Sequence, residues 1–420
     1  MQIKFLGGAR EVGRSAIMVY DDDKTKLLLD YGIKIDRKKP GFPIEIPSVD
    51  GVVISHAHMD HSGFVPALLK HRNIPIIGTS STMKLSELLL EDSLGIAKKE
   101  HRQAGFAKED LRSFSRNFVE VQYKQKTRIR DYEIELFDAG HISGSAVTLL
   151  EKRSWHGQKL VYTGDFKLEK QYLHKGAEII KGDILVMEST YALKEHPNRE
   201  ELVKEFIESI KTVLDNNGTV LLPSFAVGRS QEILSMLYKN SLIDYCYLDG
   251  MAQAATAIVL SYPSLISNSR LLSDAFGRAT RVASKKDRID AIKGPSIILT
   301  TAGMLEGGPV LNYVQKMSSN SEIMLTGFQA PNTNGRLLLE QHKMVVDKKV
   351  IKIKQPVSYY DFSAHAGMSD LYRYARESSP NIIICLHGDS NNAVSLASNL
   401  ADEGFETYAP KLGQSIEIKL

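Results

Sequence analysis

Short apolar runs that end in a small or polar residue dominate the first part of the chain. Their length and flanking turn signals are typical of strands, and they read QIKFLGG, SAIMVYDDD, TKLLLDYG, VDGVVISHAH and PIIGTS. One helical stretch interrupts them, because the spacing of apolar residues in MKLSELLLEDSLGIAKKE predicts an amphipathic helix over roughly residues 80–118. Strands resume in YEIELFDAGHISGSAVTLLEK, KLVYTGDF and GDILVMEST.

The pattern changes after Glu188 to alternating helix and strand. Helices are predicted for residues 199–215 and SQEILSMLYKN, and strands for GTVLLPSFAVG, YCYLDG, PSIILTTAGM and SEIMLTGFQ. This alternation is typical of a parallel α/β sheet. From about residue 346 the strand-rich pattern returns in KVIKIKQPVSYYDFSAHAG, NIIICLHGD and QSIEIKL. We therefore expect one strand-rich domain in two parts, residues 1–188 and 346–420, interrupted by an α/β insertion over residues 189–345.

Composition excludes some classes of protein and leaves others open. With 43% hydrophobic and 25% charged residues over 420 positions, the chain is globular rather than disordered. We find neither a run of eighteen apolar residues nor a leader, which predicts a cytoplasmic protein without a membrane partner. The net charge of +3 neither requires nor excludes nucleic acid. Cys246 and Cys385 lie in apolar runs and are expected to be buried free thiols, so a metal would need histidine and carboxylate ligands.

The segment VVISHAHMDHSG concentrates candidate metal ligands at the end of one predicted strand. Among 12 histidines in 420 residues, loose clustering of three is expected in roughly one chain in five, but the order His-x-His-x-Asp-His in fewer than roughly one in a thousand. His56 and His58 share a face of the extended chain and can hold one metal, whereas Asp60 and His61 can serve a second. Imidazole and carboxylate without thiolate favour zinc in an open, catalytic site.

Further ligands must come from elsewhere, and His141, Asp165 and His387 each lie beside a glycine at the end of an apolar strand. Taken alone, each is equally a satisfied histidine or a turn-capping aspartate. Together with the histidine motif they favour metal binding, and Asp165 is the natural bridging ligand because a carboxylate has two oxygens. Asp30 is either a turn cap or a residue that orients a ligating histidine from behind.

These residues together resemble the metallo-β-lactamase superfamily, and specifically its β-CASP nucleases. The superfamily pattern matches Asp30, His56, His58, Asp60, His61, His141 and Asp165, and the β-CASP additions match Glu188 in MESTY, His365 in DFSAHAG and His387 in LHGD. LGGAREVGRSA and PSFAVGRSQE are similar to the archaeal and eukaryotic cleavage and polyadenylation specificity factor nucleases, with RNase J as the near relative. The resemblance implies an α/β fold, an αββα sandwich with an inserted β-CASP domain, in a short form without KH domains.

The resemblance also implies a mechanism. It assigns His56, His58 and His141 to one Zn²⁺ and Asp60, His61 and His387 to another, with Asp165 bridging. Asp60 would also orient the attacking water, and Glu188 would orient His365 as the acid for the leaving oxygen; a core histidine is the alternative for His365.

The implied reaction is hydrolysis of single-stranded RNA during processing or decay, internally or from 5′ to 3′, leaving 5′-phosphate and 3′-hydroxyl ends. A homodimer through the C-terminal segment is also implied. Three alternatives remain: a DNA nuclease of the same fold, a catalytically silent RNA-binding scaffold, and a small-molecule hydrolase. Silent relatives typically lose metal ligands, and here none is missing; a small-molecule hydrolase would leave the insertion and the set Glu188, His365 and His387 unexplained.

Candidate phosphate-binding residues lie in the insertion. Ser224 and Arg229 flank a predicted strand-to-helix turn, where helix-start amides and a guanidinium form a phosphate seat. The alternative is that Ser224 caps the helix and Arg229 is a surface charge. Gly303 and Gly307 would let a loop approach phosphates, although such glycines often only form turns. Arg336 in NTNGR is a weaker candidate.

Overall fold

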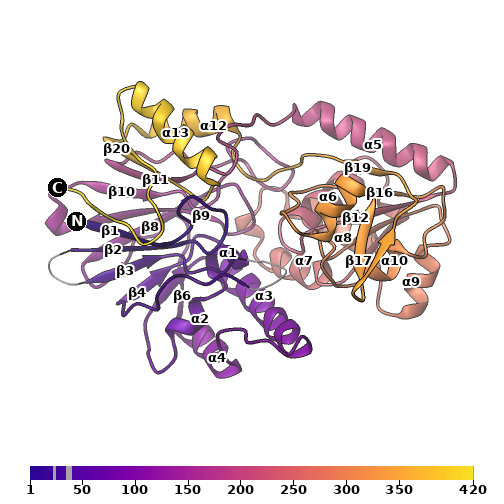
Figure 1. Ribbon diagram of the computed structural model, residues 1–420, viewed down its shortest axis with the longest axis horizontal. Coiled ribbons are helices and arrows are strands. Elements are labelled where there is room, and N and C mark those ends of the chain that lie inside the picture. The colour runs from indigo at the N-terminus through magenta and orange to yellow at the C-terminus, as the bar shows by residue number, and fades with distance from the viewer. Residues whose placement is uncertain (22–24, 35–39, 420) are drawn as a thin grey trace. The chain divides into compact units, whose positions relative to one another are not determined.

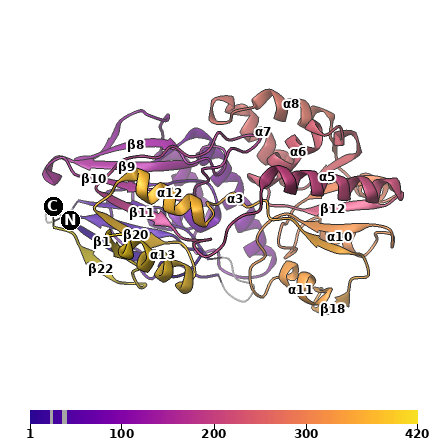
Figure 2. The same cartoon turned by 90° about the horizontal axis from the view of Figure 1, so that it is seen from above.

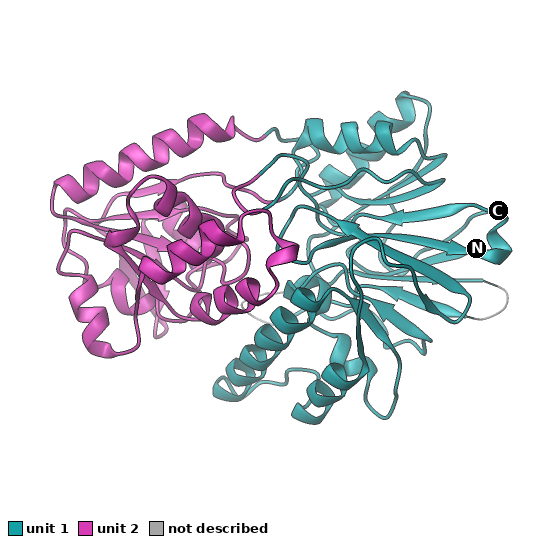
Figure 3. Cartoon of the chain, turned by 180° about the vertical axis from the view of Figure 1, so that it is seen from behind, with its two compact units in different colours: residues 1–170, 174–195, 365–420 teal, residues 171–173, 196–364 magenta. Residues whose placement is uncertain are grey.

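The structure, a computed structural model, describes residues 1–21, 25–34 and 40–419 and divides them into two compact units (Figure 3). The sandwich unit comprises residues 1–170, 174–195 and 365–420. The inserted unit comprises residues 171–173 and 196–364, so it extends beyond residue 345, where the sequence pattern places its end.

Two seven-stranded sheets form the sandwich unit (Figure 1). In spatial order the first contains β22 (Ser415–Glu417), β1 (Gln2–Gly7), β2 (Ala16–Tyr20), β3 (Lys26–Leu29), β4 (Gly51–Val53), β5 (Ile76–Gly78) and β6 (Phe118–Glu120). The second contains β21 (Glu406–Tyr408), β20 (Ile382–Leu386), β11 (Ile184–Glu188), β10 (Lys159–Tyr162), β9 (Ala146–Lys152), β8 (Tyr132–Asp138) and β7 (Thr127–Ile129).

Both faces of each sheet are buried, and alternate residues of one strand serve different cores. In β3, Leu27 and Leu29 join the core between the sheets, whereas Leu28 packs on the outer face. In β20, Ile384 belongs to the core between the sheets, whereas Cys385, a buried free thiol as expected, packs outward. Strands buried on both faces read as continuous apolar runs, which explains the sequence pattern.

Helices cover the outer faces and complete the expected αββα sandwich. The first sheet carries α1 (Met59–Ser62), α2 (Val65–Leu68), α3 (Ser80–Lys99) and α4 (Lys108–Asn117). The second carries α12 (Met368–Ser378) and α13 (Ser390–Asp402), which lie over β11 and β20 in Figure 2. A short 3₁₀ turn, η1, spans Arg153–Trp155.

The single helix expected over residues 80–118 is wrong, because the chain forms α3 and α4 with a break between them. His101 (φ 53°) and Gly105 (φ 85°) adopt left-handed backbone in that break, which an α-helix cannot accommodate.

A six-stranded parallel sheet forms the centre of the inserted unit, in agreement with the expected α/β pattern. Its strands in spatial order are β14 (Thr280–Arg281), β13 (Cys246–Asp249), β15 (Ser296–Thr300), β12 (Thr219–Pro223), β16 (Glu322–Leu325) and β19 (Val357–Tyr359). Because β19 pairs with β16, the segment after residue 345 belongs to this unit.

The other elements of the inserted unit are helices, turns and one hairpin. They are α5 (Arg199–Asp215), α6 (Arg229–Lys239), η2 (Ile243–Tyr245), α7 (Ala252–Ser261), η3 (Pro263–Leu265), α8 (Ser269–Arg278), α9 (Lys285–Ala291), α10 (Leu311–Val314), α11 (Asn334–Gln341), β17 (Lys343–Val346) and β18 (Lys349–Lys352). No helix in the described parts of the chain combines the length and the apolar character needed to cross a bilayer.

Candidate metal centre

Strand ends of both sheets in the sandwich unit bring the predicted ligands together. His56, His58, Asp60 and His61 follow β4, and His61 lies in α1. His141 follows β8, Asp165 follows β10, and His387 follows β20. Residues that are far apart in the sequence therefore converge on one edge of the sandwich, which is where irregular loops offer polar side chains without breaking a sheet.

Three overlapping groups of potential ligand atoms result, and the atoms of each group lie within 4.8 Å of one another. The groups are His56, His58, His141 and Asp165; Asp60, His61, Asp165 and His387; and Asp165, Glu188 and His365. The arrangement matches the division of ligands expected from the sequence, and Asp165 belongs to every group.

Distances in the first group fit a tetrahedral ion. His58 Nδ1 lies 3.2 Å from His56 Nε2 and 3.1 Å from His141 Nε2. Two nitrogens bound to one tetrahedral zinc at 2.0–2.1 Å are about 3.3 Å apart. The three imidazoles therefore have the spacing that a shared zinc ion requires.

Asp165 presents one carboxylate oxygen to each main group. Oδ2 lies 3.6 Å from His56 Nε2, and Oδ1 lies 3.3 Å from His61 Nε2 and 3.0 Å from His387 Nδ1. On the far side of His387, Nε2 lies 3.4 Å from Asp60 Oδ2. The carboxylate is thus placed to bridge two ions.

Buried polar atoms without hydrogen-bond partners mark the same place. They are His61 Nε2, Asp165 Oδ1 and His387 Nδ1. Buried polar atoms are nearly always hydrogen-bonded in folded proteins, and an orphaned atom loses its hydration without compensation. Three orphaned atoms that face one another fit a metal site, because an ion would satisfy all three.

Asp30 fixes the orientation of His61 from behind. Its Oδ2 accepts hydrogen bonds from His61 Nδ1 at 2.7 Å and Tyr162 Oη at 2.6 Å. The backbone N–H and the hydroxyl of Ser55 also donate to this carboxylate, each at 2.7 Å. With Nδ1 held as a donor, Nε2 is the atom of His61 left to bind a metal. Sequence reasoning missed Ser55 and Tyr162, although each adjoins a predicted ligand segment.

The second group also depends on the N-terminal loop. His387 has left-handed backbone (φ 47°), its N–H donates to the carbonyl of Gly8 at 2.8 Å, and the N–H of Gly13 donates to Nε2 at 3.3 Å. A Cβ on Gly388 would lie 2.5 Å from the carbonyl oxygen of Ser189, so only glycine fits beside this histidine.

The pKa shifts favour the deprotonated, metal-binding form of some candidate ligands and oppose it for others. Burial is the largest influence on the pKa of His56 and lowers it well below the usual value, with help from His61. Burial would raise the pKa of Asp165, but the charges of His387 and His61 hold it well below its usual range. Burial would lower the pKa of His387, yet Asp165 and Asp60 raise it to about 10. Metal binding at His387 must therefore release a proton.

His365 lies beside the cluster and is held by Glu188. His365 Nδ1 is 2.9 Å from Glu188 Oε2, and Glu188 Oε1 accepts the N–H of Phe166 at 2.9 Å. Burial would lower the pKa of His365, but the charges of Glu188 and Asp165 raise it. The side chain of His365 keeps 22% of its surface exposed while Glu188 is fully buried, so a molecule from solvent could contact His365 but not Glu188.

The candidate phosphate-binding residues all lie in the inserted unit, where only some are brought together. Ser224 follows β12, and a Cβ on Gly303 would lie 2.9 Å from the N of Phe225. Gly307 has no heavy atom within 4 Å of such a Cβ, and Arg336 is half exposed and paired with Glu340. The loop at Gly303 therefore meets the loop after β12, whereas nothing ties Gly307 or Arg336 to that place.

Both structural alternatives for Ser224 and Arg229 are wrong. The N-cap of α6 is Gly228, and the buried hydroxyl of Ser224 has no partner. Arg229 is 8% exposed and so is not a surface charge. The sequence missed Thr326, which follows β16 beside β12 and whose buried hydroxyl also lacks a partner. Two buried hydroxyls without partners therefore lie at the ends of adjacent strands, and the loop at Gly303 meets the first of these ends.

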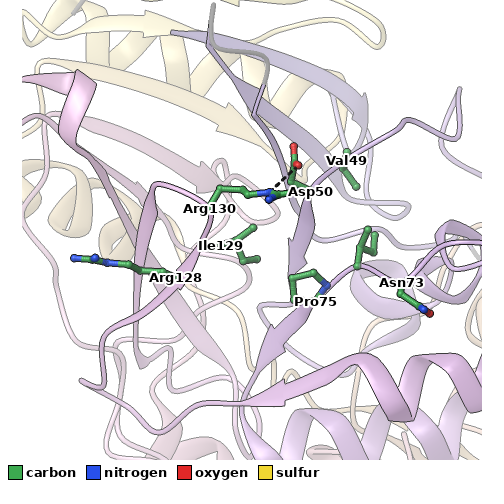
Figure 4. Close-up of a pocket in the computed structure, with 8 residues that line it drawn as sticks. Val49, Asp50, Asn73, Pro75, Arg128, Ile129 and Arg130 are labelled. Carbon is green, nitrogen blue, oxygen red and sulfur yellow. Dashed lines mark hydrogen bonds and ion pairs between the residues drawn. The ribbon is translucent and has the colours of Figure 1, made fainter.

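A cavity of about 300 Å³ lies elsewhere, beside the residues that precede β4 and β5 (Figure 4). It is lined by Val49, Asp50, Asn73, Ile74, Pro75, Arg128, Ile129 and Arg130. Its charges are already paired, because Arg130 Nε lies 3.2 Å from Asp50 Oδ1 and Arg128 Nη2 lies 2.9 Å from Glu133 Oε2. None of the predicted site residues lines it.

Three family descriptions match the sequence. The Beta-Casp domain matches residues 230–338, the anti-Pycsar protein Apyc1 matches residues 1–213, and the Zn-dependent metallo-hydrolase RNA specificity domain matches residues 350–410. The insertion therefore matches a β-CASP description and the C-terminal part a Zn-dependent metallo-hydrolase description, which agrees with a histidine and aspartate cluster able to hold metal.

Curated relatives cover the full chain. The sequence is 39% identical to the probable RNase MJ4 of Methanocaldococcus jannaschii over the whole of both chains. It is 37% identical to RNase aCSPSF2 of Saccharolobus solfataricus over 99% of this chain and 85% of that one. A crystal structure of a protein of unknown function from Enterococcus faecalis V583 shares the fold, with a TM-score of 0.62, 14% identity and 99% coverage of both chains. With its two-part sandwich, its α/β insertion and its relatives, the chain belongs to the β-CASP family of metallo-β-lactamase-fold ribonucleases.

Proposed function

We propose that this protein cleaves single-stranded RNA with two zinc ions held at the metal centre. The observation that carries the proposal is Asp165, which turns one oxygen toward each of two ligand groups. RNases among the relatives support RNA as the substrate. No member of the expected ligand set is absent from the cluster, which argues against a silent scaffold.

The ligand groups assign each residue a role. His56, His58 and His141 would hold one zinc, and Asp60, His61 and His387 the other, with Asp165 shared between them. Bound there, the two ions would supply positive charge for the phosphate oxygens and lower the pKa of a nucleophilic water. Asp60 keeps 27% of its side chain exposed, so its carboxylate can accept a hydrogen bond from that water and orient it.

His365 would protonate the leaving 3′-oxygen. Its Nδ1 is engaged by Glu188, so the proton for transfer is carried by the other ring nitrogen. Such a transfer typically contributes about 10² to 10⁴ in rate. Water attack on phosphorus with departure of the 3′-oxygen leaves a 5′-phosphate and a 3′-hydroxyl.

Substrate phosphates would be held in the inserted unit. The hydroxyl of Ser224 and the loop at Gly303 are the best supported contacts, because they lie together after β12, and the buried Arg229 at the start of α6 would add a positive charge. An anion there would also face the N-terminus of α6, which favours negative charge. Gly307 and Arg336 have weaker support.

Two further expectations belong to the same proposal. Self-association would use the C-terminal segment, whose strand β22 pairs with β1 at the edge of the first sheet, and gel filtration with light scattering would test it. Cytoplasmic RNA would be the substrate pool, which localisation of a tagged chain would test.

The decisive experiment measures metal and cleavage together. The purified chain is loaded with zinc, its metal content is determined, and it is incubated with 3′-labelled RNA that carries a 5′-monophosphate or a 5′-triphosphate, alongside matched DNA. We expect two zinc ions per chain and preferential cleavage of RNA, with internal products for an endonuclease or a ladder from the 5′ end for an exonuclease. Preference for DNA, or an inactive protein that folds but holds no zinc, would overturn the proposal.

A further inference from the structure

The hairpin formed by β17 and β18 carries an unusual charge. Residues 343–354, which we call the basic ribbon, contain five lysines and one aspartate, a net charge of +4, whereas the whole chain carries +3. The lysines are Lys343, Lys348, Lys349, Lys352 and Lys354. More than the entire excess of positive charge is thus concentrated in one short segment.

The two faces of the basic ribbon differ in chemistry. Met344 faces Ile351 in the register, and Met344 and Ile353 are buried in a core shared with Leu338 of α11. The opposite face pairs Lys343 with Lys352 and Val345 with Val350. Val350 is 66% exposed. The inner face therefore packs on the inserted unit, and the outer face presents lysines around an exposed apolar centre.

The outer face is destabilised by its own charges. Lys343 and Lys352 lie directly opposite each other, and like charges in that position cost stability. None of the five lysines has an ion-pair partner among residues 1–21, 25–34 and 40–419. The like-charge pair is therefore left without local compensation, and an anion would relieve the repulsion.

Charge and shape together point to single-stranded RNA as the occupant. Lys343 and Lys352 lie opposite each other on the outer face, and exposed Lys354 follows Lys352 by two residues, so these lysines can contact neighbouring phosphates of an extended chain. The bases of a single strand are unstacked and can contact side chains, so a single strand can use the apolar centre of this face as well as its lysines. Val350, which is exposed, can lie against a ribose or a base between the phosphate contacts, beside the partly buried Val345.

We propose that the outer face of the basic ribbon binds the sugar-phosphate backbone of the RNA substrate. None of the residues that would make these contacts belongs to the metal centre. The proposal rests on the proposed RNA cleavage. It predicts that the ribbon contributes to substrate affinity and leaves the chemical step unchanged.

A triple variant tests the proposal with a matched control. Lys343→Gln, Lys348→Gln and Lys352→Gln are combined in the full zinc-loaded chain. The control combines Lys204→Gln, Lys211→Gln and Lys316→Gln, which removes the same charge from exposed positions of the same unit. The probe is a single-stranded 30-nucleotide RNA, with KM and kcat measured over a range of salt concentrations.

We expect KM of the ribbon variant to rise about tenfold with kcat unchanged. The slope of log affinity against log salt should become shallower by about 2, because each lost phosphate contact on a single strand contributes about 0.7. The control should stay within about twofold of wild type. Bis(p-nitrophenyl) phosphate, which has no extended sugar-phosphate chain, should be hydrolysed equally by all three proteins.

The measurements distinguish a failure of the ribbon proposal from a failure of the proposed RNA cleavage. If wild type hydrolyses RNA but the ribbon variant and the control have the same KM and salt slope, the ribbon does not bind RNA, and an acidic protein partner would be its occupant instead. If wild type cleaves no RNA, the proposed function itself fails. The single variant Lys352→Gln should raise Tm, because it removes the like-charge pair; a fall in Tm would contradict the unpaired arrangement on which the proposal depends.

Discussion

Two buried carboxylates, one in each unit, show what separates a binding site from a structural network. Glu232 of the inserted unit accepts the N–H groups of Tyr172 and Leu173 at 3.1 and 2.8 Å and pairs with Arg199 at 2.9 Å. Asp165 of the sandwich unit is equally buried, but its Oδ1 faces histidines and has no hydrogen bond. Glu232 is satisfied by backbone N–H groups and a guanidinium that belong to the fold, whereas Asp165 Oδ1 contacts histidines of the candidate metal centre.

The inserted unit repeats this contrast within one sheet. After β13, Asp249 accepts hydrogen bonds from Tyr313 Oη and from Arg288. After β12 and β16, the hydroxyls of Ser224 and Thr326 have none. Burial and polarity are alike at the three strand ends, so the missing partners are what distinguish a candidate phosphate seat from a structural ion pair.

The largest expected effect is the difference in zinc content and activity between the variants Asp165→Asn and Glu232→Gln. Loss of the shared charge should release zinc and lower activity by about 10³-fold or more, since metals supply several kcal/mol of transition-state stabilisation. Glu232→Gln leaves Arg199, 11% exposed, without its counter-charge, and should lower the free energy of unfolding by about 3 kcal/mol with activity per folded molecule unchanged.

Metal analysis, single-turnover cleavage and denaturant unfolding of both variants make the comparison. The contrast between a metal-binding and a structural carboxylate would be contradicted if Asp165→Asn keeps its zinc, or if Glu232→Gln loses zinc without unfolding.

The next largest effect tests whether His365 is a proton donor, as proposed, or a metal ligand. His365→Gln should reduce kcat by about 10² to 10⁴ because the leaving oxygen loses its proton donor. Zinc content should stay at the wild-type level, since His365 is proposed to act from outside both ligand groups. Kinetics combined with metal analysis of the same preparation would test this, and a parallel loss of zinc would show that His365 is a ligand instead.

A smaller effect, on zinc affinity, is expected when Asp30 behind His61 is substituted. Asp30→Asn removes the charge that orients His61, and should weaken zinc affinity by about 10- to 100-fold. Tyr162→Phe is the matched control, because it deletes one hydrogen bond to the same carboxylate and should cost about 1 kcal/mol of stability with little change in affinity. Competition with a chromophoric chelator measures both, and equal zinc affinities for the two variants would contradict the orienting role.

The smallest effect tests the orphaned hydroxyl of the inserted unit. Ser224→Ala removes a buried hydroxyl that has no partner, so Tm should stay level or rise. If the hydroxyl contacts phosphate, KM for RNA should increase about fivefold, equivalent to about 1 kcal/mol. A clear fall in Tm with unchanged KM would show that Ser224 has a structural partner and would remove it from the phosphate seat.

The sequence predicted those features of the site that depend on neighbouring residues, and it predicted less well those that depend on how the folded chain packs. The order His-x-His-x-Asp-His predicted two ligand groups, because four ligands come from one turn. The break between α3 and α4 was missed, since left-handed backbone at His101 leaves no trace in periodicity. The burial of Arg229 was also missed, because only the folded inserted unit shields it. Ser55 and Tyr162 were missed since hydroxyl donors to Asp30 are common residues without a recognisable spacing.

The position of His387 has a consequence for the synthesis of the enzyme. Its backbone is hydrogen-bonded to the loop at Gly8, yet the whole inserted unit separates the two in the sequence. A chain made from its N-terminus can form the first ligand group early, but the second group lacks His387 until the residues after β20 emerge. On the proposed two-metal mechanism, the nascent chain would therefore be unable to cleave RNA until His387 has been added and folded against the loop at Gly8.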